Sequence, residues 1–332
     1  MSMNWDEIVG HQDAVSIVKA MLSTDKIPHA LLFAGPAGIG KRLLADRLAA
    51  GILCSNDGEK PCGQCHSCLL FGRKAHPDFT QVAPDGVSIK IDQIRLLKNV
   101  AALTPAVGAG RVCLIEDAEL MTVQAANSLL KLLEEPPPGL IFILIAGTSK
   151  PLLPTILSRC RKVAFHPLSA TMLEQALVDK GYPPAAAAIA ARLSGGRMGK
   201  ALTLLAPEGL VSRDMALQLL ASIQQVDMSG VWEQTTKLAG LETKKIVTVL
   251  EFFLYLLRDL LVVAGQYGQQ LLYNIDCVQE LADLVPAWPE SRSMAAVTAV
   301  KNTIRAIEGN ANTRLALEEL LINLKDWPEK GE

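Results

Sequence analysis

The chain has 332 residues, half of them hydrophobic, which is enough for two or three domains with sizeable cores. No uninterrupted apolar run reaches the roughly 18 residues that a membrane span needs, and the first residues lack the regions of a signal peptide. We therefore expect a cytoplasmic protein without a membrane segment. The net charge of −2 argues against a bulk electrostatic grip on nucleic acid, although it allows a local basic face.

A glycine-rich segment, residues 35–42 (Gly-Pro-Ala-Gly-Ile-Gly-Lys-Arg), follows the apolar run 30–34 and precedes residues 43–54, which have helical spacing of Leu and Ala. Strand, glycine-rich turn and helix form the context of a phosphate-binding loop. Lys41 would reach the outer phosphates. Three glycines can direct backbone N–H groups toward phosphate oxygens, namely Gly35, Gly38 and Gly40. The same turn could also bind nothing, so the binding of ATP or ADP stays open.

The site that this loop would form departs from a hydrolysing one at two places. Arg42 stands where the common signature has a hydroxyl that binds Mg²⁺, and a guanidinium has no lone pair for a cation. The apolar strand 111–117 ends in Glu116 and Asp117, the reverse of the usual order of the metal-binding Asp and the water-activating Glu. A one-methylene change displaces a carboxylate by about 1.5 Å, and such errors cost about a hundredfold in rate. We predict a site that hydrolyses nucleotide poorly, if it binds one.

Four cysteines are clustered with the spacing C-x7-C-x2-C-x2-C, namely Cys54, Cys62, Cys65 and Cys68. Four thiolates can enclose one Zn²⁺ tetrahedrally with no open position, so this site would be structural. His66 lies between the ligands and could replace one of them. The alternatives are free thiols in a loop and an iron–sulfur cluster, although the spacing departs from the common ferredoxin patterns.

Apolar strands alternate with helical patterns in the first half, which predicts an α/β, doubly wound parallel sheet. The expected strands cover residues 30–34, 76–82, 111–117, 140–146 and 162–165. A helix of residues 122–135 is expected to begin with Thr122 as its N-cap. Thr148 follows the strand 140–146 at the sheet edge where such folds place polar groups near a ligand.

The second half is expected to be all-helical, because helical patterns with Gly and Pro punctuation continue from residue 167 to the end. We predict three parts. Residues 1–166 form the phosphate-loop domain, which includes the cysteine segment 54–68. Residues 167–207 form a small helical lid, and residues 208–332 form a helical C-terminal domain.

Several motifs occur together in a fixed order along the chain. After the phosphate loop, the four cysteines and the acid-ended strand come residues 127–137 (Asn-Ser-Leu-Leu-Lys-Leu-Leu-Glu-Glu-Pro-Pro) and then Ser158-Arg159-Cys160. In this order the chain resembles bacterial clamp-loader subunits of the AAA+ class over residues 5–205, and beyond them only in helical character. The resemblance implies an AAA+ fold with a zinc-binding insertion and a C-terminal oligomerisation (collar) domain.

Within that class, three departures favour the non-hydrolysing delta-prime family of DNA polymerase III over the ATP-hydrolysing gamma/tau subunit. Arg42 and the inverted pair Glu116-Asp117 are two of them. The third is Gly199, near which the ATP-sensing Arg of the class would align; Arg197 is two residues away. The resemblance therefore implies a subunit of the polymerase holoenzyme without an ATPase activity of its own.

The resemblance also implies a role for Arg159 as an arginine finger, which acts in trans on ATP held by a neighbouring subunit during DNA replication. Gamma/tau and delta subunits in a hetero-pentamer are the implied partners, with primer–template DNA through the complex and the sliding clamp indirectly. On residue type alone, Arg159 is a surface arginine in a salt bridge. Two other functions stay open, an active clamp-loader ATPase that uses Lys41 and Glu116, and a nucleotide-free zinc scaffold.

Overall fold

The structure is a computed structural model that describes residues 5–101, 104–107, 110–147 and 152–326. The chain divides into two compact units, residues 1–176 with 195–200 and residues 177–194 with 201–332. The segment 167–207 contributes to both units, so the lid remains a proposed domain. Among the described residues, no helix has both the length and the apolar character needed to cross a membrane.

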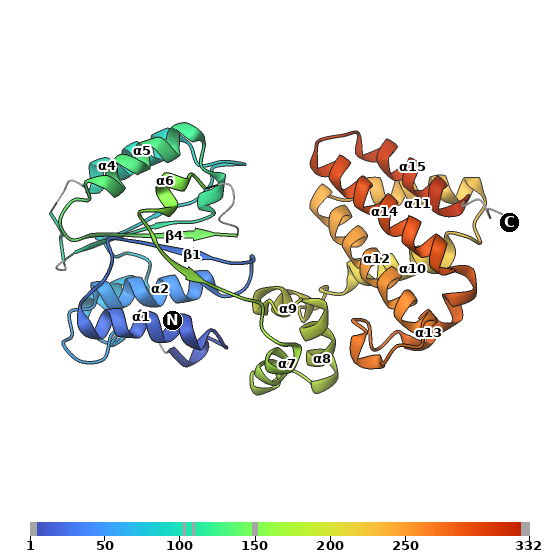
Figure 1. The fold of residues 1–332 in the computed structure, drawn as a ribbon, viewed down its shortest axis with the longest axis horizontal. Helices are drawn as coiled ribbons and strands as arrows, with labels where there is room; N and C mark the ends of the chain where they lie inside the picture. Colours follow the sequence, from blue (N-terminus) through green and yellow to red (C-terminus); the bar gives the residue numbers. More distant parts are fainter. Residues whose placement is uncertain (1–4, 102–103, 108–109, 148–151, 327–332) are drawn as a thin grey trace. The chain divides into compact units, whose positions relative to one another are not determined.

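The first unit is built around one sheet of five parallel strands in the order β2-β3-β4-β1-β5 (Figure 1). The strands are β1 (Ala30–Ala34), β2 (Phe79–Val82), β3 (Arg111–Ile115), β4 (Leu140–Ala146) and β5 (Arg161–Ala164). The chain passes from β1, which lies next to the edge strand β5, to β2 at the opposite edge. This parallel arrangement confirms the predicted doubly wound fold class.

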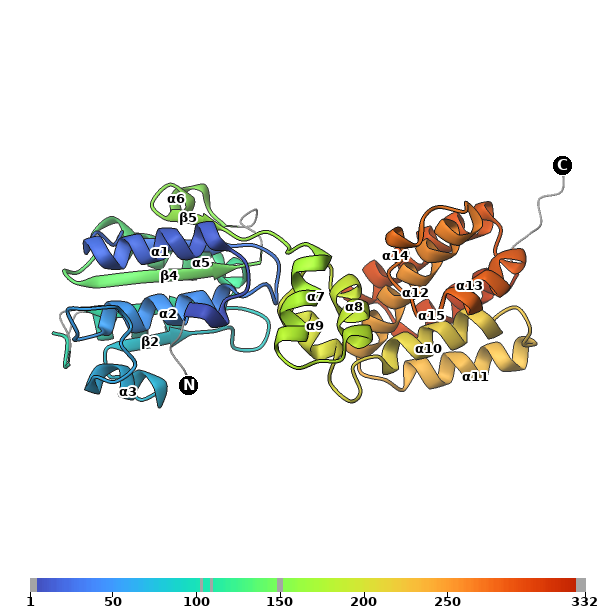
Figure 2. The same cartoon turned by 90° about the horizontal axis from the view of Figure 1, so that it is seen from below.

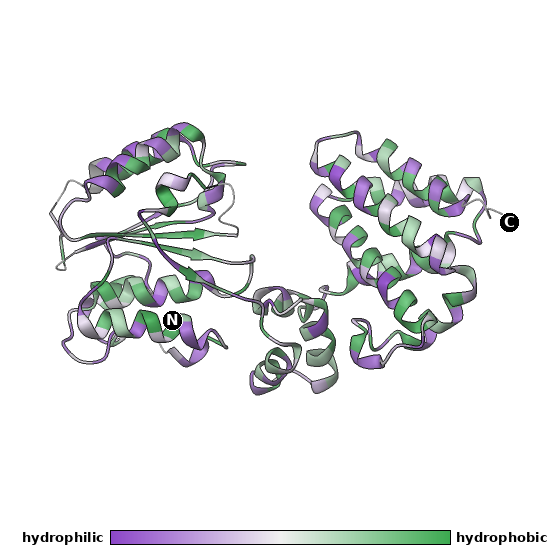
Figure 3. Cartoon of the chain, in the orientation of Figure 1, coloured by the Kyte–Doolittle hydropathy of each residue, from purple (hydrophilic) through white to green (hydrophobic). Residues whose placement is uncertain are grey.

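Helices cover both faces of this sheet. Helices α1 (Gln12–Thr24) and α2 (Lys41–Leu53) share a core with one face, and α4 (Ile91–Ala101) and α5 (Val123–Glu134) share a core with the other. Figure 1 shows the sheet nearly edge-on, and Figure 2 looks onto the face that carries α1 and α2. Successive strand residues alternate between the faces: Leu31 and Phe33 pack with α1 and α2, whereas Leu32 packs with α4 and α5. Both faces of β1 and β4 are buried, which explains the unbroken apolar runs of these two strands (Figure 3).

Two strands are shorter than the sequence predicted, because polar side chains redirect the backbone. Residues 76–78 are outside β2, since the ring Nδ1 of His76 accepts a hydrogen bond from the Asp78 N–H. Strand β3 ends at Ile115, because Asp117 takes a left-handed backbone conformation (φ 45°) that starts a short 3-10 helix. The predicted cap of α5 is confirmed, since the Thr122 hydroxyl accepts from the Ala125 N–H at 3.2 Å.

The first unit also holds α3 (His66–Gly72) and α6 (Pro154–Leu157), and α7 (Ala170–Asp179) crosses into the second unit. The other helices are α8 (Pro184–Leu193), α9 (Met198–Leu204), α10 (Val211–Ser222), α11 (Met228–Ala239), α12 (Thr243–Ala264), α13 (Val278–Leu284), α14 (Glu290–Glu308) and α15 (Thr313–Lys325). Short 3-10 helices lie at Trp5–Glu7, Ala118–Leu120, Gln269–Leu271 and Val285–Ala287.

The second unit is helical as predicted, and α12 lies at its centre. This helix packs against α10, α13 and α14. Phe253 on α12 is fully buried and packs edge-to-face against the buried ring of Trp288, with the ring centroids 6.2 Å apart. The structure buries the apolar face of α12 inside this unit.

Candidate functional site

The candidate nucleotide site lies at the carboxyl ends of three adjacent strands. The glycine-rich loop follows β1, Glu116 follows β3, and Gly147 follows β4, which lies between them. The Gly35 N–H donates to the carbonyl of Ala146 at 3.2 Å, which ties the start of the loop to the end of β4. The predicted site residue Thr148 lies outside the described residues.

The loop has the backbone conformation that its glycines permit, and Lys41 folds back onto it. Gly38 (φ 74°) and Gly40 (φ 113°) both occupy the left-handed region that disfavours other residues. The Lys41 ammonium donates to the Gly35 carbonyl and to the Pro36 carbonyl at 2.7 Å, and the residue is 6% exposed. Burial lowers the pKa of Lys41, and the nearby carboxylates of Glu119 and Asp117 oppose this shift. The ammonium is thus satisfied by the loop itself.

Arg42, at the position of the magnesium-binding hydroxyl, pairs with the acids around it. Its guanidinium forms an ion pair with Glu116, and its Nε donates to Asp46 Oδ1 at 2.8 Å. Gln81, at the end of β2, connects the same groups: its Oε1 accepts from Arg42 Nη2 at 3.0 Å, and its Nε2 donates to Glu116 at 2.7 Å. A cation of the chain itself therefore lies against the carboxylate that would face Mg²⁺ in a hydrolysing site.

The second acid of the predicted pair, Asp117, is exposed and lies close enough to Lys41 to act on its charge. Glu119, two residues further, was not among the predicted site residues. Its Oε1 accepts from the Gly147 N–H at 2.6 Å. Its Oε2 is buried and has no hydrogen-bond partner within the part of the chain that the structure describes. The carboxylates of Asp117 and Glu119 thus place negative charge near the Lys41 ammonium.

The start of α9 lies directly on the phosphate loop. The Gly199 N–H donates to the Gly38 carbonyl at 2.7 Å. A Cβ atom at Gly199 would come within 3.0 Å of that carbonyl oxygen and 3.1 Å of the Gly38 Cα. At Gly199, where the class would place an ATP-sensing Arg, the backbone therefore packs closely on the loop and leaves little room for a side chain. Arg197, which precedes α9, is half-buried.

The four cysteine thiols converge on one point, as the spacing predicted. Their Sγ atoms all lie within 4.8 Å of one another, with Cys54 and Cys65 3.9 Å apart and Cys62 and Cys68 4.0 Å apart. A tetrahedral Zn²⁺ with bonds of about 2.3 Å requires sulfur separations of about 3.8 Å. The cluster can hold a metal ion with four thiolate ligands and needs no contribution from His66.

Backbone N–H groups around the cluster favour the thiolate forms of Cys62 and Cys65. Hydrogen bonds from the backbone N–H groups of Gln64 and Cys65 lower the pKa of Cys62 to about 6. Burial raises the pKa of Cys68, so a metal ion must displace its proton. The Cys68 N–H also donates to Cys65 Sγ at 3.4 Å. Such N–H donation stabilises the negative charge of bound thiolates.

The cysteine module is fixed to the sheet domain by buried polar contacts. The Ser67 hydroxyl donates to the Leu53 carbonyl at the end of α2 and lies 2.8 Å from His76 Nε2. On the other side, the Trp5 indole N–H donates to the Lys60 carbonyl at 3.3 Å. Because His76 Nδ1 accepts from a backbone N–H, its Nε2 carries the proton that points to Ser67.

Arg159 lies just after α6 and is paired within the first unit. Its Nη2 contacts Glu134 Oε1 at 2.8 Å, and its Nη1 donates to the Thr155 carbonyl at 3.0 Å. The side chain is 35% exposed. Its neighbour Cys160 is a poor nucleophile, since burial raises the pKa of the thiol to about 11.

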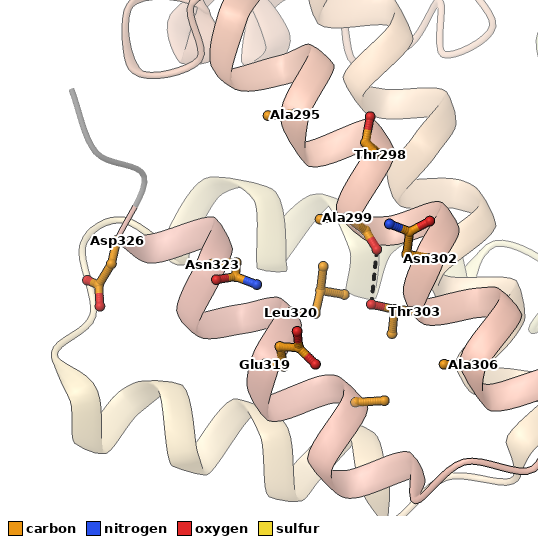
Figure 4. A pocket seen from close by; sticks show the side chains of 11 residues that line it. Ala295, Thr298, Ala299, Asn302, Thr303, Ala306, Glu319, Leu320, Asn323 and Asp326 are labelled. Carbon is orange, nitrogen blue, oxygen red and sulfur yellow. Dashed lines mark hydrogen bonds between the residues drawn. The ribbon is translucent and has the colours of Figure 1, made fainter. Parts of the chain in front are cut away.

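A separate cavity of about 630 Å³ opens between α14 and α15 in the second unit (Figure 4). Alanines and polar side chains line it, and Thr303 uses its hydroxyl to donate to the Ala299 carbonyl at 3.0 Å. Its acidic residues are Glu319 and Asp326. None of the residues predicted for nucleotide, metal or finger chemistry contributes to this cavity.

Comparison with known proteins shows which family this chain belongs to. Residues 10–169 match the family described as "DNA polymerase III, delta subunit". The DNA polymerase III subunit delta-prime of Escherichia coli K12 is 30% identical over 320 residues, which cover 91% of this chain and 90% of that protein. The chain belongs to the delta-prime family of DNA polymerase III subunits.

Other relatives extend this result. The delta-prime subunit of Bacillus subtilis strain 168 is 28% identical over 98% of this chain and 100% of that protein. The gamma/tau subunit of Mycobacterium bovis is 35% identical over 162 residues, which cover 48% of this chain and 28% of that protein. The predicted resemblance to delta-prime proteins is therefore confirmed.

Proposed function

We propose that this chain is the delta-prime subunit of a clamp loader, acts in DNA replication and does not hydrolyse ATP itself. The observation that carries the proposal is the ion pair between Arg42 and Glu116. A hydrolysing site uses a hydroxyl and an acid to hold the Mg²⁺ that bridges the phosphates. Here the hydroxyl is replaced and the acid is occupied by a guanidinium, so both protein contacts to the metal are compromised.

Binding of ATP or ADP without hydrolysis is part of the same proposal. The loop keeps the backbone conformation of Gly38 and Gly40, and Lys41 is in place. For a phosphate to bind, Lys41 would have to exchange loop carbonyls for phosphate oxygens. The contact of Gly199 with Gly38 holds the start of α9 against the same loop.

The residue that we assign to catalysis, Arg159, would act on a nucleotide of another subunit. A half-exposed guanidinium can neutralise the charge that grows on phosphoryl oxygens during ATP cleavage. The site that it serves would belong to a gamma/tau subunit, a class whose members share part of this sequence. Arg159 would thus complete a neighbouring active site in trans.

The four cysteines are proposed to hold one structural Zn²⁺. Four protein thiolates leave no open position for water or substrate, so the metal would supply stability and no chemistry. Its place is between the end of α2 and the start of α3, which it would join.

The remaining parts of the proposal concern assembly. Residues 1–166 would form the AAA+ domain, 167–207 the lid, and 208–332 a collar domain for oligomerisation. The partners would be gamma/tau and delta subunits in a hetero-pentamer. Contact with primer–template DNA and the sliding clamp would be made through that complex.

Two measurements test the proposal. The isolated chain is expected to show no Mg²⁺-dependent ATP turnover. In a complex reconstituted with gamma/tau and delta, Arg159→Ala is expected to lower the rate of the neighbouring site by about a thousandfold or more, and with it the DNA-stimulated ATPase. Arg161→Ala, at an exposed arginine two residues away, is the matched control.

Brisk turnover by the isolated chain would contradict the proposal and favour an active gamma/tau-like ATPase. An unchanged rate of the complex with Arg159→Ala would rule out the finger. A nucleotide-free scaffold would be favoured if neither the isolated chain bound nucleotide nor the Arg159 variant changed the complex.

A further inference from the structure

The guanidinium of Arg159 is held on part of its surface by groups of its own chain. Nη1 faces the Thr155 carbonyl at 3.0 Å and the Ser158 hydroxyl at 3.3 Å, both on or just after α6. Nη2 faces Glu134 Oε1 at 2.8 Å. The first two contacts are local in sequence, whereas Glu134 belongs to the last turn of α5, 25 positions earlier along the chain. Glu134 is therefore the contact that fixes this side chain relative to the rest of the domain.

The same contacts leave part of the guanidinium available. The guanidinium has five N–H donors; Nη1 makes the hydrogen bonds to Thr155 and Ser158, and Nη2 forms the ion pair with Glu134. Among the described residues, none accepts a hydrogen bond from the Nε–H or from the second Nη2 hydrogen. Two donors in a planar group suit the oxygens of a phosphate, so Glu134 can hold the guanidinium while it contacts a phosphoryl group.

We infer that Glu134 is the positioning residue of the arginine finger. This inference rests on the proposed role of Arg159. Glu134 orients the planar group from α5, and α5 itself packs against α6 and the sheet. A side chain with this many rotatable bonds would otherwise sample many orientations, and a displacement of about 1 Å can cost two orders of magnitude in rate.

A role in stability is a poor explanation of this pair. The side chains of Arg159 and Glu134 are 35% and 44% exposed. Ion pairs with this exposure contribute little to folding, because water screens the charges and the side chains lose freedom. Removal of the carboxylate is therefore expected to alter the finger and to leave the fold intact.

The test uses the complex reconstituted with gamma/tau and delta subunits. Glu134→Ala is expected to lower kcat for DNA-stimulated ATP hydrolysis about tenfold and to leave KM for ATP unchanged, since the neighbour binds the nucleotide. Glu134→Gln keeps an oxygen acceptor and is expected to fall between Glu134→Ala and the parent. The control is Glu135→Gln, at the next, equally exposed acid.

The double variant decides whether Glu134 acts through the finger. If it does, Arg159→Ala with Glu134→Ala is no slower than Arg159→Ala alone, because nothing is left to position. Equal effects of Glu134→Ala with and without Arg159 would overturn the inference, since the glutamate would then act by another route. Thermal unfolding of each isolated variant, expected to match the parent, checks the fold, and Glu134→Gln replaces Glu134→Ala if the latter unfolds.

The outcomes separate the two proposals. If Arg159→Ala slows the complex and both Glu134 variants match the parent, the positioning role is wrong and the finger stands. If Arg159→Ala itself has no effect, the proposed function fails at the finger, whatever Glu134 does.

Discussion

At the scale of single residues, the candidate nucleotide site is distinguished by where its positive charges lie. Arg42 and Glu116 are 39% and 27% exposed in their side chains. A pair with this exposure contributes about 1 kcal/mol or less to stability. Its importance is chemical, because the carboxylate that would hold Mg²⁺ is already neutralised by a group that cannot bind metal.

This charge substitution predicts how the metal should affect nucleotide binding. We expect any binding of a fluorescent ADP analogue by the parent chain to be insensitive to Mg²⁺. Arg42→Thr removes the guanidinium that pairs with Glu116 and supplies a hydroxyl ligand, so Mg²⁺ should tighten binding of that variant about tenfold, equivalent to about 1.4 kcal/mol. Titrations with Mg²⁺ and with EDTA measure this difference.

A matched control for this prediction is Arg95→Thr, which removes an exposed arginine paired with Asp92 on α4. It should leave nucleotide binding as in the parent. If Mg²⁺ tightened binding to the parent as much as to Arg42→Thr, the guanidinium would not be excluding the metal.

The sequence could predict most residues of this site but not the bonds between them. Glycines, lysine and acids stand at fixed distances from strand ends, so their place at the sheet edge follows from the pattern. Asp46 could have been added from its i+4 spacing to Arg42. Gln81 could not, because its role depends on β2 lying next to β3. The same holds for Glu134, which meets Arg159 only through the packing of α5 on α6.

At the scale of elements, unbroken apolar runs located β1 and β4, and polar residues explain why β2 and β3 are shorter than predicted. Ala30–Ala34 and Leu140–Ala146 were predicted to the residue because both faces of each strand are buried. The expected strand at residues 76–82 was too long. His76 and Asp78 are buried there, and Asp78 accepts from the N–H groups of Ala106 and Val107. Buried polar side chains that bond to distant backbone segments cannot be recognised from the alternation of polar and apolar residues alone.

The cysteine module carries the prediction at this scale. Metal analysis should find about one zinc per chain. Cys65→Ser should lose that zinc and increase hydrogen exchange in residues 54–72, because the ligands join the end of α2 to α3. Cys277→Ser, at a buried cysteine outside the cluster, should keep the metal. Zinc retained in full by Cys65→Ser would show that the four thiols do not form one site.

The pH dependence of zinc binding follows from the same contacts. The pKa of Cys62 in the metal-free chain is about 6. Below that pH its thiol holds a proton that competes with the metal, so zinc affinity should fall as pH falls, and above it this ligand is already a thiolate.

At the scale of the whole molecule, the second unit shows what a sequence without motifs can and cannot provide. Its helical character was predicted from helical patterns and Gly or Pro breaks. The neighbours of α12 could not be predicted, because amphipathic helices of similar length can pack in several orders. Only the first unit, where strands and loops have fixed relations, allowed contacts between distant residues to be anticipated.

The overall charge leads to a prediction about DNA. The chain has 32 Lys and Arg against 34 Asp and Glu, a net charge of −2. Affinity for the DNA backbone comes largely from cations that displace counterions, and nonspecific binding by basic proteins has dissociation constants of about 10⁻⁴ to 10⁻⁶ M at physiological salt. A chain without excess positive charge should be at or beyond the weak end of that range.

We therefore expect the isolated chain to leave a fluorescent primer–template unbound at about 10 µM protein and about 0.15 M salt, while the reconstituted complex binds it. Anisotropy titrations at several salt concentrations measure both. Weak binding at low salt would fit a local basic face, and the slope against salt would count its phosphate contacts. Tight, salt-resistant binding by the isolated chain would contradict this expectation, and would mean that the chain makes its own DNA contacts and does not depend on its partners for them.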